Sequence, residues 1–209
     1  MITFKPKQVT KKLLAAIGER ARDVLEKRYG LGNDNETFTL EAIGQTYGIT
    51  RERVRQIENY GISTIQKSAA YSEHAELLAE LQEAIRLLGG GVVAENVLLE
   101  SLTKDEGTRN HLYFLLVVGD AFYKGKENPL YHHRWFTEKK VADVVEKALK
   151  NVHGTLNRDD LVSEGEILTR FRNELIEIAD KHDDETLKRW LLISKQIAKN
   201  PLGDWGPSD

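Results

Sequence analysis

The chain has 209 residues, no cysteine and a formal net charge of −3. This length fits one domain or two or three small ones, and the missing thiol excludes disulfide scaffolds, cysteine-ligated zinc and a cysteine nucleophile. No apolar run approaches the ~18 residues of a membrane-spanning helix, and the first residues lack the apolar core of a secretory signal. We therefore expect a cytoplasmic protein without membrane contact.

The net charge hides an asymmetry along the chain. Residues 1–70 carry 12 Lys and Arg against 8 Asp and Glu, whereas the remainder carries 18 against 25. Because a polyanion is attracted to local positive charge, we expect any nucleic-acid contact to lie in the first third.

The chain reads as mainly helical, because proline is scarce and long alternating patterns are absent. The first predicted helix covers about residues 10–29. Gly30 is placed to end it in the left-handed conformation. The turn-forming residues 30–37 then predict a loop.

Two helices separated by a short glycine turn are predicted next. Thr39 can cap a helix over 40–47, Gly48 ends it, and Thr50 can cap a second helix that begins at Arg51. Helix, short turn and helix in this order indicate a helix-turn-helix. Its predicted core comprises Leu40, Ile43, Tyr47, Ile49, Val54 and Ile57.

The other face of the second helix carries the side chains that read base edges. Arg51 and Arg55 lie four residues apart, as do Glu52 and Gln56, so all four share a stripe at the helix start. Arginine pairs with guanine, glutamine with adenine, and glutamate accepts from cytosine. Arg53 is expected to point elsewhere and to hold a phosphate. The alternative is a solvated face with helical charge pairs, each contributing only about 0.2–0.5 kcal/mol.

Two stretches resemble region 4 of the sigma-70 family of bacterial RNA polymerase sigma factors. They read FTLEAIGQTYGITRERVRQIENYGISTIQ at 38–66 and RARDVLEKRYGL at 20–31. The resemblance implies a domain that binds the promoter −35 element and docks on the flap of the polymerase β subunit. Nothing in the chain resembles region 2 of that family, so it implies a sigma-like module inside another architecture.

The same resemblance assigns roles to individual residues. It places the base-reading positions at Arg51, Glu52, Arg55 and Gln56. It also places Arg53, Thr39 and Leu40 near the DNA backbone.

The middle of the chain predicts a winged-helix-like order of elements. A helix over 73–88, a short strand at 92–94, helices at 95–102 and 106–118, and a hairpin over 121–137 follow one another. The glycines at 89–91 are read as a helix stop and turn, because no phosphate-loop motif surrounds them.

The function of the polar residues in this middle part can be interpreted in two ways. They could form a DNA-binding wing or a protein-binding surface, and the local acidity favours the protein surface. His132 and His133 point to opposite sides of a strand, so we expect no metal site, and Trp135 is expected in the core. The residues weighed for the wing are Lys104, Arg109, Asn110, His111, Lys124 and Lys126.

The last part predicts helices at 138–151, 166–181 and 184–199, followed by a proline- and glycine-rich tail. Trp190, Leu191, Ile193 and Ile197 are expected to face inward. The acidic residues of 156–167 are read as a solvated loop and helix start.

Together these patterns predict a mainly α fold. An N-terminal helix-turn-helix domain (1–70) is followed by a winged-helix-like domain (71–137) with a small β-hairpin. A third, helical unit is expected at 138–209, with a second winged-helix-like domain as one interpretation. Its extended ending suggests further domains beyond it.

The predicted function is a sigma-like transcription factor that binds duplex promoter DNA with RNA polymerase. The alternative is a protein-interaction module that docks on polymerase without reading bases. An enzyme such as a nuclease has no supporting motif, so no catalytic residue, cofactor or metal is expected. The oligomeric state and the target sequence stay open.

Overall fold

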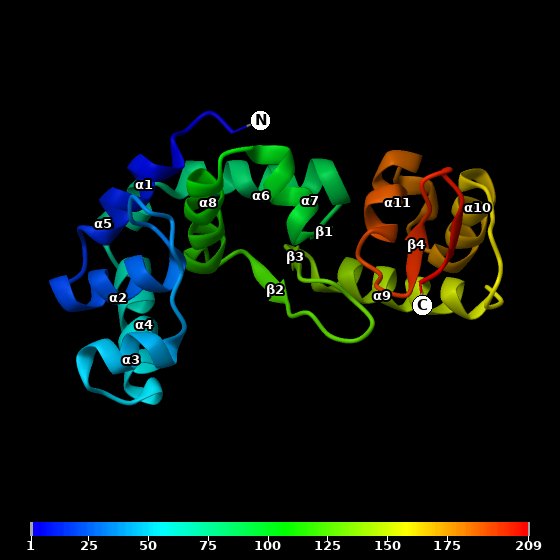
Figure 1. Ribbon diagram of the computed structural model, residues 1–209. Helices are drawn as coiled ribbons and strands as arrows, with labels where there is room; N and C mark the ends of the chain where they lie inside the picture. Colours follow the sequence, from blue (N-terminus) through cyan, green and yellow to red (C-terminus); the bar gives the residue numbers. More distant parts are fainter. Residues whose placement is uncertain (1, 209) are drawn as a thin grey trace. The chain divides into compact units, whose positions relative to one another are not determined.

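The computed structural model describes residues 2–208, which gather into two compact units (Figure 1). The N-terminal unit contains the residues up to Leu81 together with Leu99–Ala121. The C-terminal unit contains Gln82–Leu98 and the residues from Phe122 onward. The three-part division at 1–70, 71–137 and 138–209 stays a prediction.

The N-terminal unit is entirely helical in its regular elements. The helices α6 and α7 each contribute one end to it. Its elements are α1 (Pro6–Leu14), α2 (Glu19–Tyr29), α3 (Leu40–Tyr47), α4 (Arg51–Gln66), α5 (Ala69–Glu73), α8 (Glu106–Val118), and parts of α6 (Ala75–Gly89) and α7 (Glu95–Leu102).

The predicted single helix over 10–29 is wrong, because the chain breaks between α1 and α2. Gly18 is extended (φ −66°, ψ 159°) and starts α2 as its N-cap. Arg22 then donates from Nε to the Leu14 carbonyl and from Nη2 to the Ile17 carbonyl, both at 3.2 Å. These bonds fasten the start of α2 to the end of α1 and to the turn that follows it.

A buried hydrogen bond fastens α4 to α2. The Tyr29 hydroxyl donates to Glu58 Oε1 at 2.8 Å, and the Arg28 Nε atom lies 3.6 Å from the same oxygen. Burial, and then the Glu58 carboxylate, raise the pKa of Tyr29 far above its usual range, so the phenol stays protonated as a donor.

Helix α8 completes the N-terminal unit from a distant part of the sequence. It packs against α1, α2 and α4, and its Asn110 amide donates to the Gly30 and Asn35 carbonyls at 3.1 Å each. Gly30 has φ 63°, and an added Cβ there would lie 2.6 Å from the Asn110 amide nitrogen. Glycine therefore both ends α2 and admits the side chain of Asn110.

The predicted winged-helix order is confirmed in the middle of the chain. Its strands β1 (Val92–Ala94), β2 (Tyr123–Gly125) and β3 (Arg134–Phe136) form an antiparallel sheet in the order β1-β3-β2. Trp135 pairs with Val93 on one side and Lys124 on the other, and it is buried as expected.

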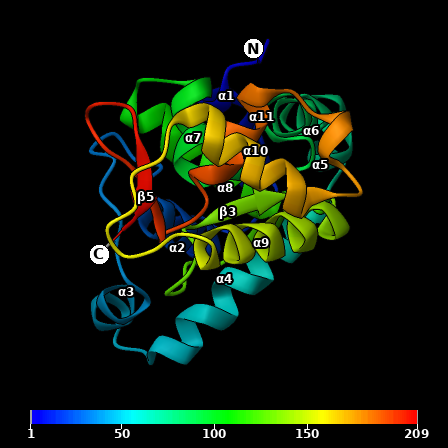
Figure 2. The same ribbon diagram turned by 90° about the vertical axis from the view of Figure 1, so that its right-hand side faces the viewer.

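The same order of elements recurs in the rest of the C-terminal unit (Figure 2). Val162 forms a β-bridge with Trp205 of β5, which pairs antiparallel with β4. The order Val162-β5-β4 thus repeats the order β1-β3-β2. The elements are α9 (Lys139–Gly154), α10 (Glu164–Leu175), the 3₁₀ helix η1 (Ala179–Lys181), α11 (Asp184–Leu191), β4 (Ile197–Lys199) and β5 (Trp205–Pro207).

Two helix predictions near the C-terminus are wrong. The helix expected over 166–181 ends at Leu175, and the one expected over 184–199 ends at Leu191. Backbone bonding explains the second error, since residues 197–199 pair with 205–207 across a turn in which Gly203 has φ 99°. The four residues expected to face inward are buried nevertheless: Trp190, Leu191, Ile193 and Ile197.

Trp190 is the centre of the C-terminal unit. Its side chain has no exposed surface, and its indole N–H donates to the Gly89 carbonyl at 2.8 Å. Phe171 and His182 contact the ring edge-on.

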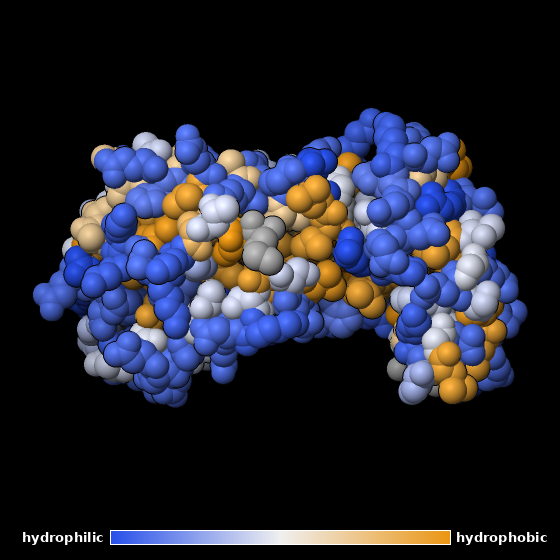
Figure 3. Space-filling model, turned by 90° about the horizontal axis from the view of Figure 1, so that it is seen from above, coloured by the Kyte–Doolittle hydropathy of each residue, from blue (hydrophilic) through white to orange (hydrophobic). Residues whose placement is uncertain are grey.

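On the face drawn in Figure 3, hydrophilic side chains cover most of the surface. Within residues 2–208 no helix is long and apolar enough to cross a membrane.

Replacing Tyr29 by Phe tests the bond that fastens α4. The change leaves the buried Glu58 carboxylate without its hydroxyl donor, so we expect unfolding free energy to fall by about 1.5–3 kcal/mol, the range for hydrogen bonds to charged groups. Urea denaturation followed by circular dichroism measures this change. Tyr60→Phe is the control, because Tyr60 lies on the same helix with 67% of its surface exposed. Equal midpoints for both variants would contradict the assignment.

Candidate nucleic-acid interface

The turn between α3 and α4 is built by one close backbone approach. A Cβ added to Gly44 would lie 2.7 Å from the Ile49 carbonyl oxygen, which is nearer than any side chain can come. Gly48 takes the left-handed conformation (φ 64°, ψ 34°) and ends α3 as predicted. The chain can therefore reverse direction within Gly48–Thr50.

Both predicted helix caps are confirmed. The Thr39 hydroxyl accepts from the Ala42 amide, and the Thr50 hydroxyl accepts from the Arg53 amide, each at 3.1 Å. Each cap satisfies one amide that the first helical turn leaves unpaired. The start of α4 is thereby fixed at Arg51.

The predicted core beneath the turn is also confirmed. Val24, Ile43 and Val54 are fully buried and join α2, α3 and α4. Around them pack the partly buried Phe38, Leu40, Tyr47, Ile49 and Ile57. Because α4 buries this face, its opposite face is left to solvent.

The side chains predicted to read bases lie on that free face. Arg51, Glu52, Arg53, Arg55 and Gln56 are all exposed. Thr39 is exposed at the start of α3, whereas Leu40 is half-buried against the core. The structure thus brings the five α4 residues together on one helix start, and their role in binding stays a prediction.

Two pairs of side chains link this face internally. Arg55 donates from Nε and Nη2 to the two carboxylate oxygens of Glu52 at 2.9 and 2.6 Å. Arg53, expected to point elsewhere, donates to the Gln56 amide oxygen at 3.0 Å. The guanidinium groups of Arg53 and Arg55 are therefore each bonded to a neighbour on the same helix.

The Arg55 pair also changes the acid–base behaviour of Glu52. Its hydrogen bonds, aided by charge, hold the pKa of Glu52 below its usual value and raise the pKa of Arg55. At neutral pH the face carries three guanidinium groups against one carboxylate, and is positive.

The alternative wing residues are partly used inside the fold. Asn110 holds the 30–35 loop, His111 is buried, and Lys124 lies 3.2 Å from Glu95 Oε2 and above the Trp135 ring. Lys104 and Lys126 are exposed, and Arg109 is half-buried. The residues at 104–111 belong to the N-terminal unit, whereas Lys124 and Lys126 belong to the C-terminal unit.

A metal centre has no ligand set in the part of the chain that the structure describes. No group of three or more His, Asp or Glu side chains is close enough to hold an ion there. His133 instead lies 3.4 Å from Glu127, whose carboxylate also pairs with Lys195.

Titration of Glu52 tests the pairing on the candidate face. Because Arg55 stabilises the ionised carboxylate, we expect a midpoint below 4.5 in the wild type and a rise toward 4.5 in Arg55→Ala. The stabilisation from this pair is present above the ordinary pKa of Glu52 and is lost as pH falls through the lowered value. Carboxyl ¹³C NMR measures the midpoint, and Arg51→Ala, which removes only a weaker and more distant charge effect, should move it less.

This part of the chain is similar to known proteins. The model of the family "Sigma-70, region 4" matches residues 13–67. RNA polymerase sigma factor SigA of Nostoc sp. is 55% identical over 47 residues, covering 22% of this chain and 12% of that protein. RpoS of Coxiella burnetii is 56% identical over 45 residues, covering 22% of this chain and 12% of RpoS.

The matched segment is a small part of both partners in the comparison. SigA1 of Synechococcus elongatus likewise has 54% identity over 46 residues, which is 11% of its length. No solved structure matches the chain. Over residues 13–67, which hold α2, α3 and α4, the chain matches sigma-70 region 4, and that segment is what it shares with bacterial sigma factors.

Proposed function

We propose that this chain is a sigma-like transcription factor that binds duplex promoter DNA, at an element of the −35 type, through the start of α4. The observation that carries the proposal is the exposed set Arg51, Glu52, Arg53, Arg55 and Gln56 on a capped helix of a helix-turn-helix. The match of residues 13–67 to sigma-70 region 4 supports it independently.

The chemistry of the exposed set suits a major groove. A helix of a helix-turn-helix contacts base edges through its N-terminal residues, which here begin at Arg51. Arg51 and Arg55 can each donate two hydrogen bonds to a guanine, and Gln56 can do the same with an adenine. Glu52 can accept from a cytosine amino group.

The remaining site residues position the domain on the duplex. Arg53 and the exposed Thr39 hydroxyl are proposed to lie near phosphates, with Leu40 at the start of the same helix. Phosphate contacts fix orientation without specifying sequence. The helix start itself adds partial positive charge, which favours a phosphate at Thr39.

Binding is proposed to require an exchange of partners at Arg55. In the free protein the Arg55 guanidinium is bonded to the Glu52 carboxylate. On binding, a base must take the place of that carboxylate as the hydrogen-bond acceptor. Since the pair is exposed, this exchange costs little. The internal pairs therefore hold the side chains in place without blocking the face.

Partnership with RNA polymerase is the second part of the proposal. The relatives that share this segment are named RNA polymerase sigma factors, and the flap of the β subunit is the proposed contact. The first 70 residues carry only a small positive excess, so affinity for DNA alone should be modest and sensitive to salt. Tethering to polymerase would raise the effective concentration at the promoter. The proposal involves a cytoplasmic protein without catalytic activity, cofactor or membrane contact.

The competing candidate keeps the polymerase contact and omits base reading. The acidic balance of residues 71–209 favours it, since 25 acidic side chains against 18 basic ones oppose a polyanion. The two candidates differ in whether the α4 arginines are needed for sequence preference.

Replacing Arg55 by Ala tests base reading. We expect affinity for a preferred −35-type duplex to fall by about 1–3 kcal/mol, with a smaller loss on a scrambled duplex. Fluorescence anisotropy at moderate salt measures both. Arg86→Ala is a matched control, because Arg86 forms the same bidentate bonds with Glu83 three residues earlier on an exposed helix face. Equal affinities of wild type and Arg55→Ala for the preferred duplex would reject base reading.

A polymerase binding assay separates the two candidates. The double variant Arg51→Ala/Arg55→Ala should still bind purified core polymerase or its β flap, because the folded core of α2, α3 and α4 is unchanged. It should lose promoter preference within the complex. Absence of any polymerase binding by the wild type would contradict the polymerase partnership while leaving DNA binding testable on its own.

A further inference from the structure

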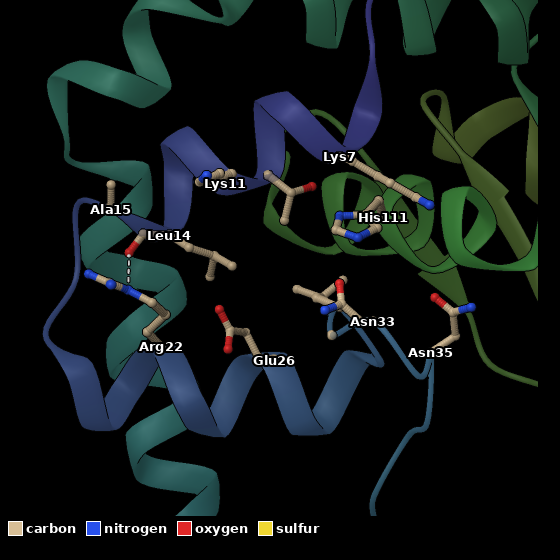
Figure 4. A pocket seen from close by; sticks show the side chains of 12 residues that line it. Lys7, Lys11, Leu14, Ala15, Arg22, Glu26, Asn33, Asn35 and His111 are labelled. Carbon is tan, nitrogen blue, oxygen red and sulfur yellow. Dashed lines mark hydrogen bonds between the residues drawn. The ribbon is translucent and has the colours of Figure 1, made fainter.

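A pocket of about 470 Å³ lies inside the N-terminal unit, away from the candidate DNA face (Figure 4). Its walls come from α1, α2, the 30–35 loop and α8, and none of its lining residues belongs to α3 or α4. The volume is within the range of sites that hold small ligands, about 300–1,000 Å³. The base-reading proposal makes no use of it.

The lining of the pocket is positively charged. Lys7, Lys11 and Arg22 project from its walls, with Glu26 as the single carboxylate among the lining residues. Lys7 lies 3.5 Å from Asp105 in an exposed pair, which contributes little. Arg22 uses two of its five donors on the Leu14 and Ile17 carbonyls.

Two buried polar groups in the wall lack a hydrogen-bond partner. Thr10 has no exposed surface and His111 is 7% exposed, yet neither Thr10 Oγ1 nor His111 Nδ1 bonds to any described residue. Most buried polar atoms in folded proteins are paired, and an unpaired one commonly marks a site for water or a ligand. Burial, then the charge of Lys7, lowers the pKa of His111, while a hydrogen bond to the Leu31 backbone raises it. At neutral pH the ring is therefore neutral, and its unpaired Nδ1 is left as an acceptor.

The mouth of the pocket is held in place by glycine and asparagine. A Cβ added to Gly107 would lie 2.6 Å from Asn35 Oδ1 and 3.1 Å from Lys7 Nζ, so glycine lets α8 lie close to these two side chains. Asn110 fixes the backbone at Asn35 from the same helix. The loop backbone at Asn35 is therefore fastened to α8.

We propose that this pocket binds a small phosphorylated molecule of up to nucleotide size. Lys11 and Arg22 supply the charge-assisted bonds that phosphate oxygens accept. The unpaired Thr10 hydroxyl can donate to a phosphate oxygen, and Asn33 offers an amide at the loop. His111 Nδ1 can accept from a hydroxyl or N–H of the ligand. Leu14 and Leu31, also in the lining, suit a less polar part such as a nucleobase.

Calorimetric titration of the full chain tests the proposal with four probes: orthophosphate, pyrophosphate, AMP and ATP, with adenosine as the uncharged control. We expect at least one phosphorylated probe to bind with Kd below about 1 mM. Tighter binding of AMP or ATP than of pyrophosphate assigns the site to a nucleotide, and the reverse order assigns it to a free phosphate compound.

Variants at adjacent positions locate the binding. Lys11→Gln should weaken the best probe about tenfold, as expected for one lost charge-assisted bond. Lys12→Gln removes the same charge one residue further along α1, outside the pocket lining, and should have little effect. Thr10→Val, which keeps the side-chain shape, should also weaken binding while the fold persists.

Three results would overturn the proposal. They are no phosphorylated probe binding below about 1 mM, equal losses in Lys11→Gln and Lys12→Gln, or loss of binding in Arg55→Ala. The last two would place the anion on the general positive surface or on the DNA face.

Discussion

The structure of the N-terminal unit depends on one steric constraint, the contact between the Ile49 carbonyl and the backbone of Gly44. Only a residue without Cβ leaves room for that oxygen, which lies 2.7 Å from where a Cβ would be. The contact lets α4 start immediately after α3 and fixes the angle at which Val54 meets Ile43. A larger residue at 44 would push the turn outward and separate the two helices from their common core.

Helix α4 has two parts with different surroundings. In the second half, Glu58 and Gly61 are buried, and Glu58 is bonded to Tyr29. A Cβ added to Gly61 would lie 3.1 Å from Leu25 Cδ1, so α4 packs closely against α2 there. The first turn at Arg51 buries only Val54. The packed second half of α4 therefore holds the solvated first half in place. A side chain that is held in place before binding loses less conformational entropy when it binds.

Sequence patterns predicted the features that depend on neighbouring residues. The caps, the left-handed Gly48 and the core positions follow from spacing within about ten residues. The α3–α4 pair and its exposed arginines could therefore be predicted from the sequence. The break before Gly18 was missed, because it depends on Arg22 bonding to the Leu14 and Ile17 carbonyls and not on apolar spacing. The strand at 197–199 and the pocket beside His111 were missed for a related reason. Each is made by segments that are distant in sequence or that pair only after folding.

The most direct test of the account is an amide ¹H–¹⁵N NMR titration of the chain with a −35-type duplex. We predict that the largest shift changes fall at residues 50–56, with smaller ones at Thr39 and Leu40, and that they saturate with the duplex concentration. Changes concentrated at 104–126 or in the C-terminal unit, with residues 50–56 unmoved, would contradict a DNA-reading role for α4.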